Sequence, residues 1–322
     1  MKFSIIICGK NEVLNLDACL TACINLSYPK EEFEVLYVDN NSTDGSLSVA
    51  KKYPIKTIRD ESYKLSEVRN RGIRESVGEV IIFFDADTVV DKNYLLVAEE
   101  VIKPEAVGCV TGRVLPIHST WVSNYLGVSL FESYPRYKKG RKVFSAPCCD
   151  FVIKRSVINK IGFFRVDFSS GLNVARFFED KELSFRIRKA GYKILYDPRM
   201  RIHHDSTHSF KKLVNIWIQG AVGRVGLIQA DMKDVYTQLF RYNIALLYFL
   251  LCLIGLAINP IFGYFLVSFA VAVQLFLCLK SYIDNGMFFS NFFVKSWMDP
   301  LSILVIDTSV FYFRFIKPIF TK

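Results

Sequence analysis

Short apolar runs alternate with segments of helical spacing through the first 100 residues, and this alternation restricts the fold more than any other feature of the chain. Continuous apolar runs of strand length are typical of parallel strands that are covered on both faces. We therefore predict an α/β fold, with a mostly parallel sheet and helices on both faces. The predicted strands are Phe3–Cys8, Phe33–Val38, Ile55–Ile58 and Val80–Phe84, and the predicted helices are Asn15–Asn25, Asp44–Lys52 and Leu65–Val77.

Three of these strands lead directly into polar clusters. The clusters are Lys10-Asn11-Glu12, Asp39-Asn40-Asn41 and Asp85-Ala86-Asp87. Open parallel sheets bind ligands beyond the carboxyl ends of their strands, so the three clusters predict one shared site. The carboxylates of Asp85 and Asp87, one residue apart, suit a hard cation such as Mg²⁺ or Mn²⁺. This motif alone is a weak signal, because a solvated turn has the same sequence.

The pattern between residues 110 and 205 is mixed. The expected strands here are Ser145–Ile153, Tyr192–Tyr196 and Met200–His204, and the expected helices are Ser156–Lys160 and Glu179–Ala190. Two adjacent histidines, His203 and His204, end the last strand and must face opposite sides of it. Either one could be a metal ligand, and His208 is a more distant choice.

The C-terminal part of the chain changes character, because no charged residue occurs between Arg241 and Lys280. Tyr242–Ile258 and Ile261–Leu279, separated by Asn259-Pro260, each approach the length that crosses a bilayer. We expect a transmembrane hairpin in residues 242–322, followed by Leu301–Phe313 as a third span or an interfacial helix.

Basic residues flank this hairpin on both sides, which places both of its ends in the cytoplasm. Residues 206–241 interleave basic and apolar side chains, so we expect an amphipathic segment on the membrane surface. The formal net charge of +10 then has a lipid explanation and does not require nucleic acid. The apolar run after Lys2 is too short for a signal peptide, which predicts a cytoplasmic catalytic domain in a multi-pass protein of the cell membrane.

The eight cysteines show no CxxC pair and no zinc-site spacing. They are typical of a reducing compartment rather than of a disulfide framework. The vicinal pair Cys148-Cys149 is interpreted as packing rather than redox chemistry, because free cysteines are usually buried.

Taken in order, several motifs resemble the family 2 inverting glycosyltransferases of the GT-A fold. These motifs are Ser4–Glu12, Val38–Ser46, Arg69-Asn70-Arg71-Gly72, Asp85-Ala86-Asp87, Ala146–Phe151 through Ile161–Phe164, and Phe178–Leu183 with Arg186 and Gly191. The resemblance covers residues 1–205, which we take as the catalytic domain. One departure is Asp150, which stands where the family often has a small or amide residue and predicts an altered acceptor pocket.

The resemblance implies a role for each polar cluster. It places a nucleotide sugar against Asn11, Glu12, Arg69 and Glu179, with Asp85 at the ribose. For Arg69, a solvated helix face is the structural alternative. It gives Asp39 a contact to the nucleobase, although an Asx turn with Ser42 is the structural alternative.

The resemblance further implies that Asp87 and His204 bind the metal. Asp180 is implied to be the general base that accepts the proton of the acceptor hydroxyl. Its position at a helix N-terminus predicts a lowered pKa.

These observations predict a metal-dependent glycosyltransferase with a nucleotide-sugar donor and a lipid-linked or glycan acceptor. A polyprenyl-phosphate sugar synthase is one alternative, and a non-catalytic membrane transport or scaffold protein is another. A dinucleotide-dependent oxidoreductase is excluded, because no G-x-G-x-x-G follows a strand. A nucleotidyltransferase would carry a longer, glycine-rich basic loop than Gly9-Lys10-Asn11-Glu12.

Overall fold

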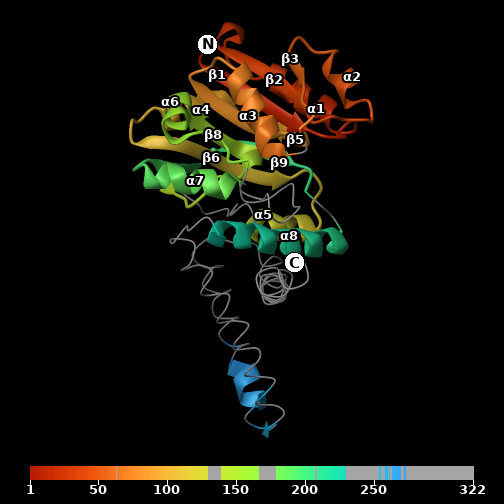
Figure 1. Cartoon of the computed structure of the whole chain (residues 1–322), viewed down its shortest axis with the longest axis vertical. Helices are drawn as coiled ribbons and strands as arrows, with labels where there is room; N and C mark the ends of the chain where they lie inside the picture. The colour runs from red at the N-terminus through yellow and green to blue at the C-terminus, as the bar shows by residue number, and fades with distance from the viewer. Residues whose placement is uncertain are drawn as a thin grey trace.

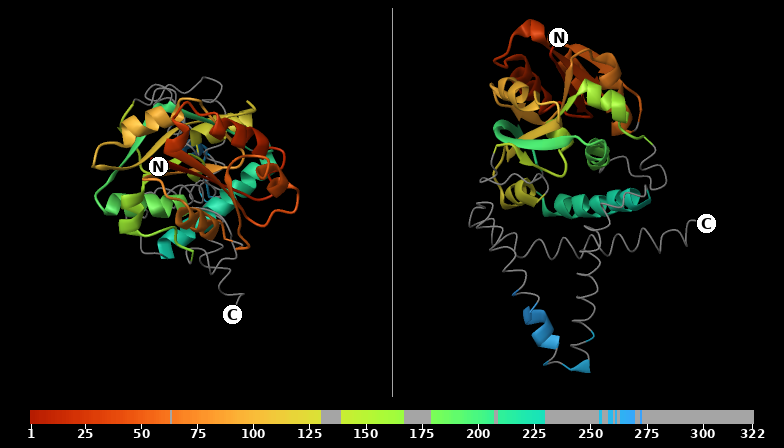
Figure 2. Two further views of the ribbon diagram at one scale, coloured as in Figure 1. Left: turned by 90° about the horizontal axis from the view of Figure 1, so that it is seen from above. Right: turned by 90° about the vertical axis from the view of Figure 1, so that its left-hand side faces the viewer.

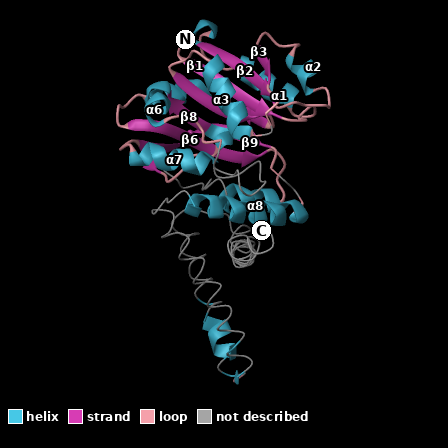
Figure 3. Ribbon diagram, viewed as in Figure 1, coloured by secondary structure: helices cyan, strands magenta, loops and turns pink. Residues whose placement is uncertain are grey.

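The computed structural model of this protein describes residues 1–62, 64–129, 139–166, 179–206 and 209–229, and a few residues between 254 and 272. Figure 1 and Figure 3 show these elements along the chain. The helices are α1 (Leu16–Ile24), α2 (Ser46–Ala50), α3 (Leu65–Glu75), α4 (Tyr94–Ile102), α5 (Trp121–Ser129), α6 (Arg155–Ile161), α7 (Glu179–Lys189) and α8 (Phe210–Gln229), with 3-10 turns η1 (Lys30–Glu32) and η2 (Cys148–Asp150). The strands are β1 (Phe3–Gly9), β2 (Phe33–Asp39), β3 (Lys56–Arg59), β4 (Val80–Asp85), β5 (Thr88–Val90), β6 (Val107–Pro116), β7 (Arg141–Lys142), β8 (Phe151–Lys154) and β9 (Lys193–His204).

The nine described strands form one mixed sheet in the order β3-β2-β1-β4-β8-β6-β9-β5, with β7 paired to β9. Strands β1 to β4 are parallel to one another, as predicted. The second half corrects the expectation of a mostly parallel sheet, because β8 runs antiparallel to both β4 and β6, and β5 runs antiparallel to β9. The sheet is therefore an α/β layer of parallel strands extended by a mixed half.

Both faces of the sheet are covered by helices, which explains why its central strands are apolar without interruption. Along β1, Ile5 and Ile7 pack in a core with α1 and α4, whereas Ile6 packs in a second core with α3, α6 and α7. All three isoleucines are fully buried. Strand β1 therefore contributes side chains to both cores at the centre of the domain.

The register of the parallel strands brings the predicted site residues to one edge. Cys8 pairs with Asp85 of β4, and Gly9 pairs with Asp39 of β2. The carboxyl ends of β1, β2 and β4 are therefore level, and the polar residues that follow them lie together. Gly9 permits this close approach, because a Cβ there would lie 2.6 Å from the Cβ of Ala86.

The structure differs from the sequence prediction mainly after residue 85. The predicted strand Ser145–Ile153 is in fact the turn η2 followed by a shorter β8. The two strands predicted before His204 are one strand, β9, interrupted by an irregularity where Thr111 and Arg113 of β6 pair with Tyr196 and Arg201. This irregularity explains why the sequence pattern breaks at Asp197-Pro198.

Helices α5 and α8 lie side by side below the sheet, as both Figure 1 and Figure 2 show. They meet through aromatic side chains: the ring of Trp217 in α8 lies 6.2 Å from that of Tyr125 in α5, and the ring of Phe210 in α8 lies 6.2 Å from that of Trp121 in α5. Leu213 and Trp217 are buried, whereas Phe210, Lys211 and Lys212 are exposed. Part of the segment 206–241 is therefore a helix with buried apolar and exposed basic side chains near its start, and its contact with a membrane stays a prediction.

Among the described residues, no helix is both long enough and apolar enough to cross a bilayer. The expected hairpin Tyr242–Ile258 and Ile261–Leu279 lies largely outside the described residues, and Leu301–Phe313 lies wholly outside them.

Candidate active site

The loops after β1 and β2 are tied together by side-chain to backbone hydrogen bonds. Asn11, with a positive φ of 59°, accepts a hydrogen bond from the Thr43 amide at its Oδ1 (2.9 Å) and donates its own amide to Ser42 Oγ (2.9 Å). The Glu12 amide donates to Ser46 Oγ (2.9 Å). These bonds fix Asn11 and Glu12 at the sheet edge, where the sequence predicted them.

Asp39 is fully buried at the end of β2. Its Oδ2 accepts a hydrogen bond from the Ser42 amide (3.0 Å), and its Oδ1 accepts one from the Tyr37 hydroxyl (3.2 Å). The predicted Asx turn is therefore present. These two donors hold the carboxylate in one orientation. A contact between Asp39 and a nucleobase stays a prediction.

The Asp85-Ala86-Asp87 segment is the turn between β4 and β5, and it is called the acidic turn below. His204 faces this turn from the end of β9. Pairing of β5 with β9 sets Thr88 opposite His204. His204 Nε2 lies 3.3 Å from Asp87 Oδ1 and 3.8 Å from Asp85 Oδ2. The structure thus brings together the predicted metal ligands Asp87 and His204, with Asp85 beside them.

The adjacent histidine points elsewhere. His203 is 41% exposed, and its Nε2 lies 3.5 Å from the carboxylate of Asp91. Alternation along β9 sends it to the opposite face, as the sequence implied for one of the pair. His204 is therefore the histidine that faces the acidic turn, and His208 lies outside the described residues.

The electrostatics around Asp87 favour a cation. Burial raises the pKa of Asp87 to about 7, and repulsion from Asp85 and Glu12 adds to this shift although His204 opposes it. Asp87 Oδ1 is buried and accepts no hydrogen bond within the described chain. Two carboxylates and an imidazole are oxygen and nitrogen donors that fit Mg²⁺ or Mn²⁺. The residues at this turn therefore suit the predicted metal.

Arg69 connects this turn to α7. Its side chain is 3% exposed; it donates a hydrogen bond to Glu179 Oε1, and its Nη2 lies 3.4 Å from Asp85 Oδ1. Burial opposes ionisation of Asp85, but His204 and Arg69 outweigh it and lower the pKa of this carboxyl below its usual value. Arg69 is therefore buried between the two acidic groups and contacts both of them. It does not lie on a solvated helix face, which was the alternative interpretation.

Asp180 corrects one prediction. The N-terminus of α7 was expected to lower its pKa, and the Lys181 amide does donate to Asp180 Oδ1 (2.7 Å). Burial and the neighbouring Glu179 carboxylate nevertheless raise the pKa of Asp180 to about 6. Repulsion and desolvation outweigh the helix terminus here, and the shift moves this carboxyl toward the range of a general base at neutral pH.

Asp150 lies in the interior of the domain, and the altered acceptor pocket expected from it stays a prediction. It is fully buried and accepts hydrogen bonds from the Tyr94 hydroxyl, the Thr111 hydroxyl (3.2 Å) and the Gly112 amide. These contacts anchor η2 to α4 and β6. Asp150 is a structural residue of the domain interior.

The vicinal cysteines Cys148 and Cys149 are buried free thiols, as free cysteines usually are. Sequence reasoning missed the position of one of them: the Cys149 sulfur, a carboxylate oxygen of Asp85 and a ring nitrogen of His204 all lie within 4.8 Å of one another. No spacing pattern could have revealed this, because the three residues come from separate elements.

Comparison with known proteins agrees with this geometry. Residues 4–162 match the model of the glycosyl transferase family 2. This match covers just under half of the chain and supports a family 2 glycosyltransferase domain in this region. The probable glycosyltransferase YdaM of Bacillus subtilis is 29% identical over 214 residues, which are 61% of this chain and 49% of that protein, so the chain spans about half the length of this relative.

Two further proteins cover more of the chain. A dolichyl N-acetyl-alpha-D-glucosaminyl phosphate 3-beta-D-2,3-diacetamido-2,3-dideoxy-beta-D-glucuronosyltransferase of Methanococcus voltae is 24% identical over 272 residues, covering 78% of this chain and 80% of its own length. The mannosyltransferase PcManGT of Pyrobaculum calidifontis, solved with GDP-Man and Mn²⁺, has a TM-score of 0.63 at 14% identity and covers 97% of this chain and 88% of its own. This second likeness shows a shared GT-A-like fold.

Proposed function

We propose that the protein transfers a sugar, with inversion, from a UDP- or GDP-sugar to an acceptor at a membrane. One observation carries the proposal: Asp85, Asp87 and His204 converge at the carboxyl ends of the parallel strands, and the buried Arg69 links them to Glu179, next to Asp180. A donor site and a base are thereby held by neighbouring side chains. Fixed positioning of this kind supplies much of the rate of group transfer.

The donor half of the proposed reaction uses the strand-end loops. Asn11, Glu12 and Asp39 bind the nucleoside, Asp85 contacts the ribose, and Arg69 with Glu179 borders the diphosphate. Asp87 and His204 would hold Mg²⁺ or Mn²⁺, which when bound neutralises charge on the leaving nucleoside diphosphate. The buried, unsatisfied Oδ1 of Asp87 supports this assignment.

The acceptor half uses Asp180. Its carboxylate accepts the proton of the acceptor hydroxyl while that oxygen attacks the anomeric carbon, opposite the departing diphosphate. The bond from oxygen to the anomeric carbon forms as the bond to the diphosphate breaks, which inverts the configuration in one step. A pKa of about 6 leaves Asp180 ionised at neutral pH and basic enough to take a proton.

Two observations support a membrane location for the acceptor. The name of the Methanococcus voltae relative describes a dolichyl-linked acceptor. Among the described residues near 260, the large apolar side chains Ile258, Ile261, Tyr264 and Phe265 are 64–82% exposed, as expected for a surface that lipid covers. We propose a lipid-linked or glycan acceptor, and a cytoplasmic catalytic domain anchored by residues 242–322.

A donor panel tests this proposal. The full chain in detergent is incubated with UDP-, GDP- and dTDP-sugars, Mn²⁺ and a lipid-linked acceptor, and release of nucleotide is measured. We expect release from one donor, its loss with EDTA, and its loss in Asp87→Ala and Asp180→Asn. Asp91→Ala is the matched control, since Asp91 meets the histidine on the other face of β9 and should leave release nearly unchanged.

Two outcomes of the donor panel would reject the proposal. If no donor is consumed and titration calorimetry detects no metal-dependent binding of UDP or GDP, the transferase proposal is wrong, and a scaffold or transport role replaces it. Equal losses in Asp87→Ala and Asp91→Ala would likewise reject the assignment of the acidic turn.

A further inference from the structure

Three ligating side chains of different chemistry converge beside the acidic turn. Asp85 ends β4, Cys149 lies in η2 and His204 ends β9, and their ligand atoms lie within 4.8 Å of one another. We propose that Asp85, Cys149 and His204 form a binding site for a thiophilic divalent ion, Zn²⁺ or Cd²⁺. In this site, Cys149 is the ligand that selects the metal.

The Cys149 thiol is available for this role. The residue is 3% exposed, and within the described chain its sulfur makes no hydrogen bond or disulfide. Its turn is held in place, because the next residue, Asp150, is anchored by Tyr94, Thr111 and Gly112. This buried sulfur lies beside a carboxylate and an imidazole, and these three groups are common ligands of a metal ion.

Burial raises the pKa of the Cys149 thiol well above its usual value, so the free protein holds it protonated. This shift does not oppose metal binding, since a coordinating thiol loses its proton to solvent as the metal–sulfur bond forms. It instead keeps the sulfur unreactive toward other electrophiles until an ion arrives. The proton leaves, and a thiolate ligand replaces the thiol.

The donor set distinguishes one class of ion from another. Mg²⁺ and Mn²⁺ prefer oxygen ligands, whereas Zn²⁺ and the softer Cd²⁺ gain strongly from a thiolate. Zinc ligands bond at about 2.0–2.3 Å, so the three atoms must close by roughly 1 Å through side-chain rotation. Asp87 Oδ1, 3.3 Å from His204 Nε2, lies near enough to act as a fourth donor.

His204 belongs both to this site and to the proposed Mg²⁺ or Mn²⁺ site, so the two ions exclude each other. This consequence, unlike the site itself, rests on the proposed function: a thiophilic ion should inhibit transfer by competing with Mn²⁺. The thiolate would thus make the enzyme sensitive to zinc or cadmium through a residue outside the acidic turn.

Cadmium titration of the full chain in detergent tests the site directly. Bound Cd²⁺ gives an ultraviolet ligand-to-metal charge-transfer band only where a thiolate coordinates it, read as the difference from the metal-free protein. We expect a saturable band at one equivalent in the wild type and in the control Cys148→Ser, and its loss in Cys149→Ser. In Cys149→Ser, Zn²⁺ affinity measured by calorimetry should fall by at least about tenfold, while Mn²⁺ affinity changes much less.

The opposing results are equally clear. A wild type without a saturable band, or a band of unchanged strength in Cys149→Ser, overturns the proposal. Should Cys149→Ser fail to fold by circular dichroism, His204→Ala takes its place, and an unaltered cadmium affinity there also overturns it. The readout needs no sugar donor, so an inactive donor panel without metal-dependent binding of UDP or GDP, but with an intact band, would reject the proposed function and leave this site standing.

Discussion

The guanidinium of Arg69 on α3 donates a hydrogen bond to the carboxylate of Glu179 at the start of α7, 110 residues further along the chain. The same side chain lies against Asp85 through its other amino group and over the ring of Phe164, 5.7 Å from its centroid. One buried cation therefore connects the acidic turn after β4 to the segment that carries Asp180. Four predictions follow from this arrangement and its surroundings.

Arg69→Met should destabilise the protein by about 3 kcal/mol, the lower end of the range for breaking a buried pair, because Asp85 and Glu179 keep some solvent contact. Urea unfolding measures the change. Arg71→Met is the matched control: Arg71 lies on the same helix, and its pair with Glu75 (2.9 Å) is at the surface, so little change is expected. Equal losses in both variants would show that Arg69 acts only as a helix residue.

The rate of transfer should depend on the ionisation of Asp180. Its folded-state pKa is raised to about 6, so kcat/KM should be constant above that pH and fall about tenfold per unit below it. Glu179→Gln removes a neighbouring negative charge and frees Arg69, and both changes lower the pKa of Asp180. The inflection should therefore move to lower pH. A profile that keeps its inflection in this variant would point to another base.

Gly9→Ala should weaken metal binding. A Cβ at Gly9 would lie 2.6 Å from the Cβ of Ala86, and it must displace the turn that carries Asp85 and Asp87. Gly72→Ala meets Ile6 Cγ2 at 2.4 Å, within the core, and is the comparison. Both should cost about 1–3 kcal/mol of stability, but only Gly9→Ala should also lower Mn²⁺ affinity by calorimetry. Identical metal affinities in the two variants would contradict this.

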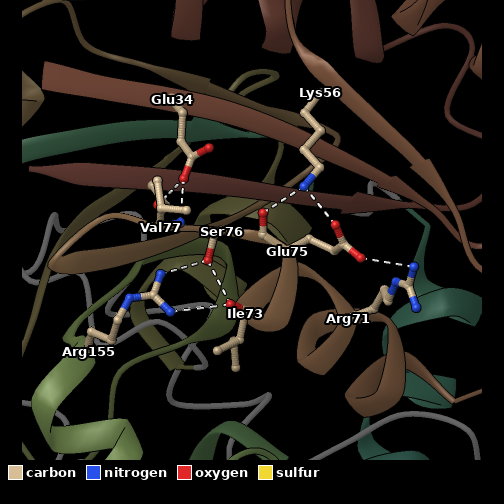
Figure 4. A network of polar contacts seen from close by, with 9 residues as sticks. Glu34, Lys56, Arg71, Ile73, Glu75, Ser76, Val77 and Arg155 are labelled. Atoms are coloured by element: carbon tan, nitrogen blue, oxygen red, sulfur yellow. Dashed lines mark hydrogen bonds and ion pairs between the residues drawn. The ribbon is translucent and has the colours of Figure 1, made fainter. Parts of the chain in front are cut away.

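Arg155 should matter for stability and not for the site. Figure 4 shows its guanidinium reaching the end of α3, where it donates to Ser76 Oγ (2.8 Å) and to the Ile73 carbonyl (3.3 Å), and a further bond goes to the Gly78 carbonyl. Arg155→Ala removes one donor from each of these acceptors, although Ser76 Oγ still donates to the Ile73 carbonyl, and should lower stability by about 1–3 kcal/mol. Donor and metal affinities, measured on the folded protein, should stay at wild-type values; a tenfold loss of either would show that this contact reaches the site.

The parallel half of the sheet was predictable because its signal is local. Apolar runs such as Phe3–Cys8 and Val80–Phe84 are continuous, and the polar residues after them follow from topology alone, so β1, β2 and β4 agree with the prediction within a residue or two. The antiparallel half was harder, because η2 takes its shape from the contacts of Asp150 with distant elements.

Within the site, residue identity was easier to predict than residue environment. The sequence indicated Asp87 and Asp180, but their pKa values depend on burial and on charges brought near by folding. Arg69 looked equally suited to a solvated helix face, but in the folded chain it is buried beside Glu179, Asp85 and the ring of Phe164. Cys149 has no local signal at all, because its neighbours in space come from β4 and β9.

The three-residue strand β5 determines which of two adjacent histidines faces the acidic turn. It sets Thr88 opposite His204 and Val89 opposite His203, and both histidines have the same chemistry. A slip of one residue between β5 and β9 would exchange them, turning His204 away and presenting His203 to the acidic turn. The register between β5 and β9 therefore decides whether His203 or His204 faces the acidic turn. A single insertion near residue 197 could exchange the two without changing either side chain.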